Sequence, residues 1–414
     1  MIFKTGREFV KNRAIVHAFI FSNLFILVCS FEILYGLPNI LKYLASVYVL
    51  LSLAIFYWYS DRIRFQSFFL KFLVSSFILF LVYLLFTSIR FEKFYIQEAF
   101  GDKFYLLPYV VPIIFLRLRY TLSTFRTILR LTYSILPFAI LSLIFLIIFP
   151  DVYEYPDNVF IVLTFSFANA LLLYVSHLLK WRFVTPLALL YSILFIILLA
   201  SLGRRGETFE QFLPLILFVW IRIRSSSIST IKKGIFIALS LSAVIPASLY
   251  VYSISGDIYL FQRGLDKDGF NDTRGETVLN FLNDYGSRPN DYIIGRGLNG
   301  KVRKWIVATE KSTKFSRSIE IGYFDSLLKG GFVYLLLMLT LFLSSIYLGY
   351  FKSKNDLVKG LSFIVLWQIL YMISFGLLNF SVFYFMLWIA VATCLDRVTR
   401  NYDNNYLIRE LNAT

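Results

Sequence analysis

Apolar residues along this chain fall in long runs, each close to the about twenty residues that a helix needs to cross a hydrocarbon core about 30 Å thick. Short polar and basic connections separate the runs. The fold class predicted from this pattern is an all-α integral membrane protein of about twelve transmembrane helices. The spans are expected near 14–35, 40–59, 67–88, 104–116, 131–149, 159–179, 183–202, 211–221, 235–255, 322–350, 361–378 and 380–395.

Two of these runs, 104–116 and 211–221, are short for a full crossing. They contain Pro108, Pro112 and Pro214, and proline removes a backbone donor and kinks or ends a helix. We therefore expect kinked or partly re-entrant segments at both places.

One connection, 256–321, is polar and long enough to fold by itself. It divides the chain into spans one to nine in 1–255, a large loop that is partly helical, and the last three spans with a tail in 322–414. In its second half, from Arg288 to Arg317, basic residues outnumber the acidic ones. This half of the loop is predicted to attract anions.

The charge pattern predicts the topology. The formal net charge is +16, but most Lys and Arg lie in connections on one side of the predicted spans, as Arg117 and Arg130 do. The positive-inside rule then places both termini in the cytoplasm and the 256–321 loop on the outer face. The basic segment 1–13 precedes an apolar run with no small-residue cleavage site, so we expect a retained first span. The charge gives no reason to expect nucleic acid binding.

Several kinds of chemistry are disfavoured. Cys29 and Cys394 both lie in apolar runs, which argues against a disulfide framework or a thiolate metal cluster. No motif for a nucleotide or a metal occurs, so no cofactor and no metal ion are predicted. His17 and His177 lie toward the cytoplasmic ends of their predicted spans, as packed or interfacial histidines do. A reaction at the outer face must then use carboxylates, arginines or the substrate itself.

Two adjacent arginines, Arg204 and Arg205, lie in an outer connection, against the positive-inside tendency. A guanidinium presents a rigid fork of donors that matches phosphate oxygens. The pair therefore suits a lipid-linked phosphate or pyrophosphate, and simple contact with lipid headgroups is the alternative.

The outer loop contains two further patterns. Arg274 and Gly275 precede an amphipathic stretch, 276–285, that suits the membrane surface. Farther along, Gly295–Gly300 has glycines at three of six positions, which is typical either of close backbone approach to a ligand or of an ordinary turn.

Two carboxylates, Glu320 and Asp325, lie near the outer boundary of the span that follows the loop. Carboxylates in the first turn of a helix are stabilised by the helix dipole, which is a structural explanation. An ionisable group at the margin of a membrane is costly unless it lines a wet cavity, which favours a functional one.

Four local motifs occur in order, and together with the topology they resemble the O-antigen polymerase and O-antigen ligase superfamily of polytopic membrane glycosyltransferases. The fold implied is similar to that of the C-type membrane glycosyltransferases, which use lipid-linked donors. The motifs are Arg205–Gly206, Arg274–Gly275, the Gly295, Gly297 and Gly300 turn, and the stretch Glu320–Gly331 that leads into the next span.

Ligases of this superfamily usually carry a histidine near the place of Ser318 to Glu320, and this chain has none there. The resemblance therefore implies the polymerase (Wzy-type) branch, which joins undecaprenyl-pyrophosphate-linked oligosaccharide repeat units at the outer face of the cell inner membrane. It implies a metal-independent, inverting transfer for lipopolysaccharide or a related surface polysaccharide. The implied partners are the lipid-linked oligosaccharide, membrane lipids and a chain-length regulator protein.

The resemblance implies catalytic roles for Glu320, Arg205 and Arg274. The two arginines bind the pyrophosphate and stabilise its charge as it leaves, and Glu320 accepts the proton of the acceptor hydroxyl, with Asp325 as its substitute. The residues expected to bind the pyrophosphate or the glycan are Arg204, Arg296, Arg303, Arg317, Tyr323 and Asp325.

Three alternatives remain open at this point. An O-antigen ligase has the same fold and another acceptor, and the absence of an outer histidine argues against it. A flippase or transporter of lipid-linked oligosaccharides needs charged residues at mid-membrane, which the spans nearly lack. An assembly factor without catalytic activity is the third.

Overall fold

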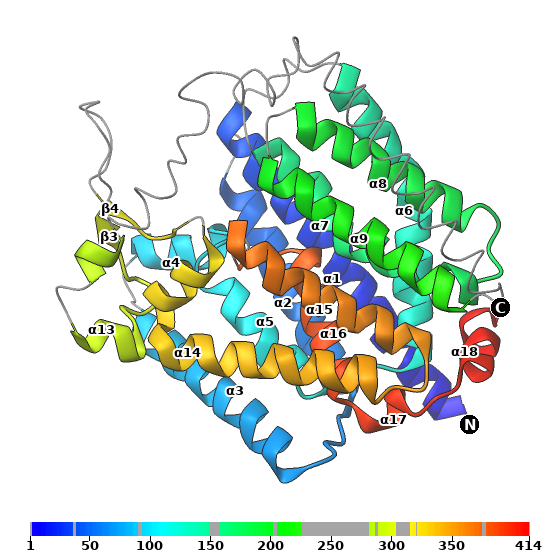
Figure 1. The fold of residues 1–414 in the computed structure, drawn as a ribbon. Helices are drawn as coiled ribbons and strands as arrows, with labels where there is room; N and C mark the ends of the chain where they lie inside the picture. The colour runs from blue at the N-terminus through cyan, green and yellow to red at the C-terminus, as the bar shows by residue number, and fades with distance from the viewer. Residues whose placement is uncertain are drawn as a thin grey trace.

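The computed structural model describes residues 2–35, 39–89, 93–148, 157–201, 205–225, 281–285, 289–303, 315–319, 321–374 and 378–413. The span expected near 235–255 lies outside this part of the chain. Within it, nearly every element is a helix (Figure 1).

From Ile2 to Ser225, the described residues form nine α-helices, a 3₁₀ turn and one short strand pair. Their bounds are α1 (Ile2–Tyr35), α2 (Asn39–Tyr59), β1 (Asp61–Arg62), α3 (Phe68–Ser88), α4 (Lys93–Gly101), α5 (Leu107–Phe115), β2 (Leu118–Arg119), α6 (Leu122–Ile148), α7 (Asp157–Val175) with a 3₁₀ turn η2 (Ser176–Leu178), α8 (Val184–Ser201) and α9 (Arg205–Ser225).

The second half adds a small polar unit and the last helices. Residues 281–285 are helical, and the other bounds are α13 (Pro289–Ile294), β3 (Val302–Arg303), β4 (Phe315–Ser316), α14 (Gly322–Ile346) with a π-helical end η3 (Tyr347–Phe351), α15 (Asp356–Ser374), α16 (Val382–Leu395), α17 (Arg397–Arg400) and α18 (Asn404–Leu411). The strands β3 and β4 pair antiparallel.

Six of the described helices are long and apolar enough to cross a membrane, which confirms the all-α membrane class. They are Gly6–Cys29, Ile40–Tyr59, Phe68–Ser88, Leu122–Ile148, Gly322–Phe351 and Asp356–Ile373. Shorter apolar helices cover Phe165–Leu178, Val184–Ala200, Gln211–Ile221 and Val382–Leu395. The number of about twelve spans stays a prediction.

Some boundaries differ from those expected. The helix α5 is short, as predicted, with Pro112 inside it. By contrast, α9 is a continuous helix of 21 residues, because its polar first turns are also helical and Pro214 does not end it. The helix α1 begins at Ile2, so the basic N-terminal segment continues the first span. His17 accordingly lies in the middle of Gly6–Cys29 and not near its start.

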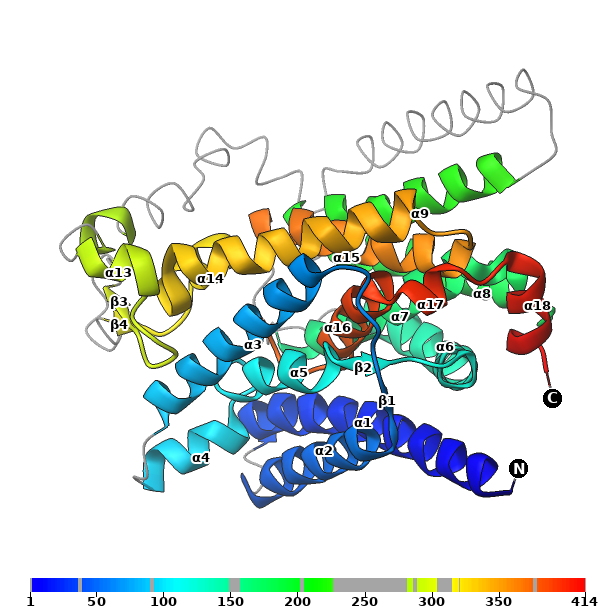
Figure 2. The ribbon, with the colours of Figure 1, turned by 90° about the horizontal axis from the view of Figure 1, so that it is seen from below.

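The helix α16 forms the centre of the bundle (Figures 1 and 2). All fourteen of its residues are buried, and it packs against α5, α7, α14 and α15. Because protein and not lipid surrounds it on every side, a short apolar helix is sufficient there. The aromatic ring of Trp388 packs between Phe77 of α3 and Phe342 of α14.

Both termini lie at one end of the bundle (Figure 2). Near the start of α1, the Lys11 ammonium donates to the Thr121 hydroxyl just before α6, at 3.0 Å. Arg126 of α6 donates to the carbonyl of Ala413 at 2.9 Å. The unit made of α13, β3 and β4 lies at the opposite end, so the polar loop and the termini are separated by the length of the bundle.

We expect Asn355→Ala to loosen the attachment of the C-terminal segment. Asn355 is fully buried, and its amide donates to the carbonyls of Thr399, at 2.8 Å, and Tyr402, at 3.1 Å, while its oxygen accepts from the Val358 amide. Leaving these groups unpaired costs about 2 kcal/mol. The purified variant should therefore unfold at a lower temperature in detergent, whereas Asn401→Ala, at an exposed position nearby, should match the wild type.

Candidate functional site

The helix α14 is interrupted where the polar outer segment meets it. Gly331 has φ 63° and ψ −166°, which is not helical, so the helix breaks there. Because of the break, the carbonyls of Leu328 and Lys329 do not accept hydrogen bonds from backbone amides one helical turn later. The backbone amides of Arg296 and Gly297 take their place, at 2.8 and 3.1 Å. Backbone hydrogen bonds therefore join the loop at Arg296 and Gly297 to the broken helix.

Glycine is needed on both sides of this junction. A Cβ on Gly295 would lie 2.6 Å from the backbone nitrogens of Gly330 and Gly331. A Cβ on Gly331 would lie 2.4 Å from the carbonyl oxygen of Ile293. Gly295 also has a positive φ of 73°, which side chains other than glycine rarely adopt. At Gly295, close approach to α14 accounts for the glycine, so no ligand is needed to explain it.

Lys329 ties two parts of the loop together. Its side chain is only 4% exposed, and its ammonium donates to the carbonyls of Leu298 at 2.9 Å and Gly300 at 3.5 Å. It also donates to the carbonyl of Arg317 on the far side of the loop. Because a buried ammonium must have its donors satisfied, these carbonyls set where both segments lie.

Asp325, one helical turn before Lys329, acts on the same segments. It is 7% exposed, and its carboxylate accepts a hydrogen bond from the Ile319 amide at 3.2 Å. Four residues apart on one helix, Asp325 and Lys329 lie on the same face, which favours an interaction between their opposite charges. The Asp325 carboxylate therefore positions Ile319, the residue immediately before Glu320.

The glycine turn also closes the end of α3. The Ser88 hydroxyl accepts from the Leu298 amide at 3.1 Å, and the Asn299 side chain donates to the Ser88 carbonyl at 2.8 Å. The hydroxyl of Tyr105 donates to the side-chain oxygen of Asn299. These contacts connect the loop to α3 and to the segment before α5, which are about two hundred residues distant in sequence.

An open pocket of about 840 Å³ lies between the end of α3 and the loop. Its walls come from the last turns of α3, from α13 and from the glycine turn. The lining residues are Tyr83, Leu84, Thr87, Ser88, Asp284, Asp291, Ile294, Gly295, Arg296, Gly297, Asn299, Gly300 and Lys301.

Arg296 lines this pocket, but most of its donors bind the protein. Its guanidinium contacts the carboxylates of Asp291 and Asp284, at 2.6 and 2.7 Å, and the carbonyls of Asp284 and Lys301, at 2.9 and 2.8 Å. Burial lowers the pKa of Arg296, but the hydrogen bonds to the two carboxylates outweigh it and raise the pKa. Four of the five donors are thus occupied, so Arg296 mainly holds the loop in shape.

A second set of charged side chains surrounds Arg317, next to the segment between α4 and α5. Arg317 donates to the Glu98 carboxylate at 2.5 Å, and its guanidinium lies over the ring of Tyr105, 5.5 Å from the centroid. Asp102, just beyond α4, accepts from the Phe104 amide at 2.8 Å, and burial raises the pKa of this carboxyl. This region therefore combines cations with two carboxylates, Glu98 and Asp102, that the sequence pattern did not predict.

The remaining predicted residues divide into two groups. The hydroxyl of Tyr323 donates to the carbonyl of Ile369 in α15 at 2.7 Å, which ties the start of α14 to that helix. Outside the described part of the chain are Arg204, Arg274 and Glu320, together with the side chains of Arg205 and Arg303.

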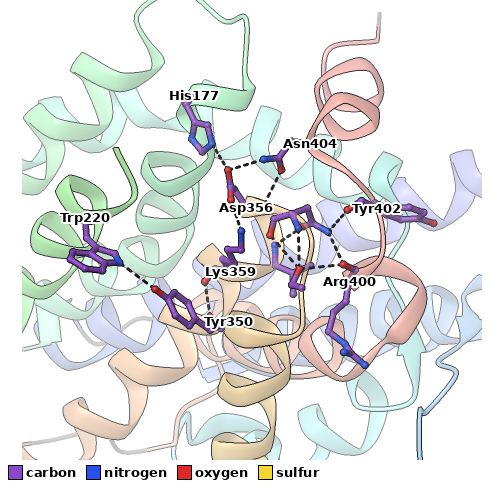
Figure 3. Close-up of polar contacts among 12 residues, drawn as sticks. His177, Trp220, Tyr350, Asp356, Lys359, Arg400, Tyr402 and Asn404 are labelled. Atoms are coloured by element: carbon purple, nitrogen blue, oxygen red, sulfur yellow. Dashed lines mark hydrogen bonds and ion pairs between the residues drawn. The ribbon is translucent and has the colours of Figure 1, made fainter. Parts of the chain in front are cut away.

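The direction of α9 places Arg205 relative to the site. Near its other end, Trp220 donates to the hydroxyl of Tyr350 at 3.3 Å, in the π-helical end of α14 (Figure 3). Arg205 begins α9, about 22 Å from Trp220 along the helix axis. It therefore lies toward the end of the bundle where α14 begins, as does the loop.

The amphipathic stretch differs from its expected place on the membrane surface. Phe281 and Tyr285 are buried, and they pack with Ile319 and Leu328 in a small apolar cluster at the start of α14. The ring of Phe281 lies 5.2 Å from that of Phe324. In the described residues, this side of the stretch faces protein.

His177 belongs to a polar network (Figure 3) beside α18, at the end of the bundle opposite the α13 unit (Figure 1). His177 lies 3.1 Å from the carboxylate of Asp356, which also accepts from Lys359 at 3.1 Å and from Asn404 at 2.9 Å. These contacts attach α18 to α15 and η2. His177 therefore takes no part in the site at the loop.

Gly331→Ala should destabilise the protein, because the alanine must adopt a left-handed conformation and its methyl group meets the Ile293 carbonyl. A loss of about 2 kcal/mol or more is expected, seen as a lower unfolding temperature and a smaller monodisperse fraction after purification. At Gly6 a Cβ has no neighbour within 4 Å, so Gly6→Ala is the matched control. Equal unfolding temperatures for the two variants would contradict this role of Gly331.

Lys329→Met keeps the length of the side chain but leaves three loop carbonyls without their donor. Amide hydrogen exchange in 295–300 and 315–319 should become faster by about tenfold, since these segments lose their common attachment. Exchange in α15 should not change. Lys301→Met, on an exposed side chain of the same loop, serves as the control. Unchanged exchange in both segments would show that Lys329 does not hold them.

The chain matches no protein-family model, no curated protein and no solved structure. The resemblance to the polymerase and ligase superfamily therefore depends on the topology and the local motifs of the sequence. Independently of that resemblance, the described residues form a polar pocket between α3 and the glycine turn, built from segments that are distant in the chain.

Proposed function

We propose that the protein is a polysaccharide polymerase that joins undecaprenyl-pyrophosphate-linked oligosaccharide repeat units into O-antigen or a related surface polysaccharide. The reaction takes place at the outer face of the cell inner membrane, and both termini are cytoplasmic. The observation that carries the proposal is the open pocket of about 840 Å³ between α3 and the glycine turn. It offers room for several sugar units beside a membrane-facing helix.

The position of this pocket suits a substrate with an apolar tail and a polar head. Tyr83 and Thr87 line it, while Phe86 and Leu79 of the same helix are 81% and 68% exposed, as lipid-facing residues are. A polyprenyl chain can lie in the bilayer along this face of α3. Its glycan then enters the pocket, where the exposed Thr87 hydroxyl and the backbone of the glycine turn offer neutral polar groups that suit sugar hydroxyls.

The proposed transfer is a single displacement at the anomeric carbon of the growing chain. The bond from this carbon to the pyrophosphate oxygen breaks, and a bond to the acceptor hydroxyl oxygen of a new repeat unit forms. Glu320 takes the hydroxyl proton, and the pyrophosphate leaves on its lipid. Arg205 and Arg274, aided by Arg204, Arg303 and Arg317, stabilise the negative charge that develops on it. One in-line attack inverts the configuration.

The roles of the described residues follow from their contacts. Apart from its bond to Glu98, Arg317 has donors with no partner among the described residues, so of Arg296 and Arg317 it is the better suited to a phosphate. Arg296 and Tyr323 act as positioning residues, because their polar groups already bind the protein. Asp325 positions the segment that carries Glu320.

Arg274→Ala, Arg205→Ala and Glu320→Gln should each reduce polymer formation by about a hundredfold or more, because each removes charge stabilisation or the base. The measurement is the ladder of chain lengths formed by purified protein in lipid nanodiscs from the lipid-linked repeat units of its own host. Lys352→Ala, an exposed residue at the opposite end, should retain full activity. Normal chain lengths from both arginine variants would overturn the assignment.

The same assay separates the alternatives. A ligase transfers the glycan only when lipid A core is added, and it forms no longer lipid-linked chains without that acceptor. A flippase moves the lipid-linked unit between leaflets without changing its mass. An assembly factor leaves the substrate unchanged in both respects.

A further inference from the structure

A second pocket, of about 660 Å³, lies at the end of the bundle that holds both termini. It is formed by the end of α2, the β1 strand, the first turns of α3 and the residue before β2. The side chains that matter for its chemistry are Tyr57, Arg62, Gln66, Ser67, Lys71 and Arg117. Arg7, near the N-terminus in α1, lies 3.6 Å from Asp61 of β1. This contact places the pocket at the end of the bundle that holds the N-terminus.

Three cations face this pocket, and within the described part of the chain none has a carboxylate partner. Arg62 lies over the ring of Tyr57, 3.8 Å from its centroid, and Arg117 lies 3.5 Å from the Ser75 hydroxyl. The side chain of Lys71 is exposed. Cations held apart from carboxylates in this way attract an anion.

The carboxylates of the adjoining segments have other partners. Asp61 pairs with Arg7 at 3.6 Å. Asp396 lies 3.5 Å from Arg119 and accepts from the amide and the hydroxyl of Thr399. Neither lines the pocket, so the charge around it remains strongly positive.

A fourth cation supports the pocket from behind. Arg400 is 3% exposed and donates to the Gln66 side chain at 2.9 Å, and its Nε has no partner among the described residues. Its side chain points away from the Asp356 network (Figure 3). Burial lowers the pKa of Arg400, and an anion beside Gln66 would offset part of that cost.

The rim of the pocket is aromatic and exposed. Trp58 at the end of α2 and Phe68 and Phe72 at the start of α3 are 79%, 82% and 60% exposed. Exposed aromatic residues at helix ends are typical of the boundary between bilayer and water. Ser67, the N-cap of α3, lines the pocket, so the positive end of this helix lies beside it, and no acidic residue in the first turn offsets that charge.

We propose that this pocket binds the phosphate headgroup of an anionic phospholipid, taken from the leaflet at the end that holds the termini. Arg62, Lys71 and Arg117 contact the phosphate, and the acyl chains lie along Phe68 and Phe72 of α3. The alternative is diffuse attraction of anionic lipids, to which all basic residues at this end would contribute. A specific pocket differs because only the residues that line it contribute. The site is independent of the polymerase reaction.

Native mass spectrometry of the full-length protein, titrated with phosphatidylglycerol or phosphatidylcholine, tests the proposal. The wild type should retain one phosphatidylglycerol in preference to phosphatidylcholine. The triple variant Arg62→Gln, Lys71→Gln and Arg117→Gln should bind it at least about tenfold more weakly. The matched control carries Lys180→Gln, Arg182→Gln and Lys352→Gln, which remove the same charge from exposed positions at this end. Its affinity should stay within about twofold of the wild type.

Equal weakening in both triple variants would overturn the proposal, because it would show that only net charge matters. If inorganic phosphate at an equal concentration displaced the lipid, the proposal that the ligand is a phospholipid would be wrong, and the pocket would be a site for free phosphate. If the triple variant does not purify as a monodisperse protein, Lys71→Gln alone should weaken binding by about fivefold. An unchanged affinity in that single variant would contradict the pocket.

Discussion

The site beside α3 depends on one interaction, the backbone contact between the broken helix α14 and the glycine turn. The conformation of Gly331 leaves two carbonyls without helical partners in a place where water is scarce, and such groups are costly. The amides of Arg296 and Gly297 satisfy them. These two loop amides replace the helical amides as donors. The position of the loop relative to the helix is therefore fixed by backbone hydrogen bonds alone, without any side chain.

The buried charges near the membrane margin follow from that contact. A lysine and an aspartate one turn apart would be expensive in a plain transmembrane helix. Here Lys329 has loop carbonyls as acceptors and Asp325 has a loop amide as donor, so both charges are satisfied by the segment that they hold. Loop and helix therefore stabilise each other, and this loop forms one wall of the pocket beside α3.

The sequence predicted the elements of this arrangement better than their partners. Runs of apolar residues identify the long helices, but the break at Gly331 was not predicted, since the span was expected to run without interruption over 322–350. The contact of Arg317 with Glu98 joins residues 219 positions apart, and no local pattern signals it. The pairing of Arg296 with Asp284 and Asp291 was missed for another reason, because a basic segment suggests a bound anion even where nearby carboxylates occupy the arginine. Lys329 was visible as a charge near a span end, but its acceptors come from the folded loop.

The contacts of Asp325 bear on which carboxylate is the base. A general base must reach the acceptor hydroxyl with a free oxygen. Asp325 is nearly buried and one of its oxygens already accepts the Ile319 amide, next to Glu320 in the chain. In the proposed reaction, Asp325 therefore serves to position Ile319, the residue that precedes Glu320 in the chain. The proposed division of roles gives each carboxylate of this stretch its own task, since Asp325 supports the backbone and Glu320 is left to accept the proton.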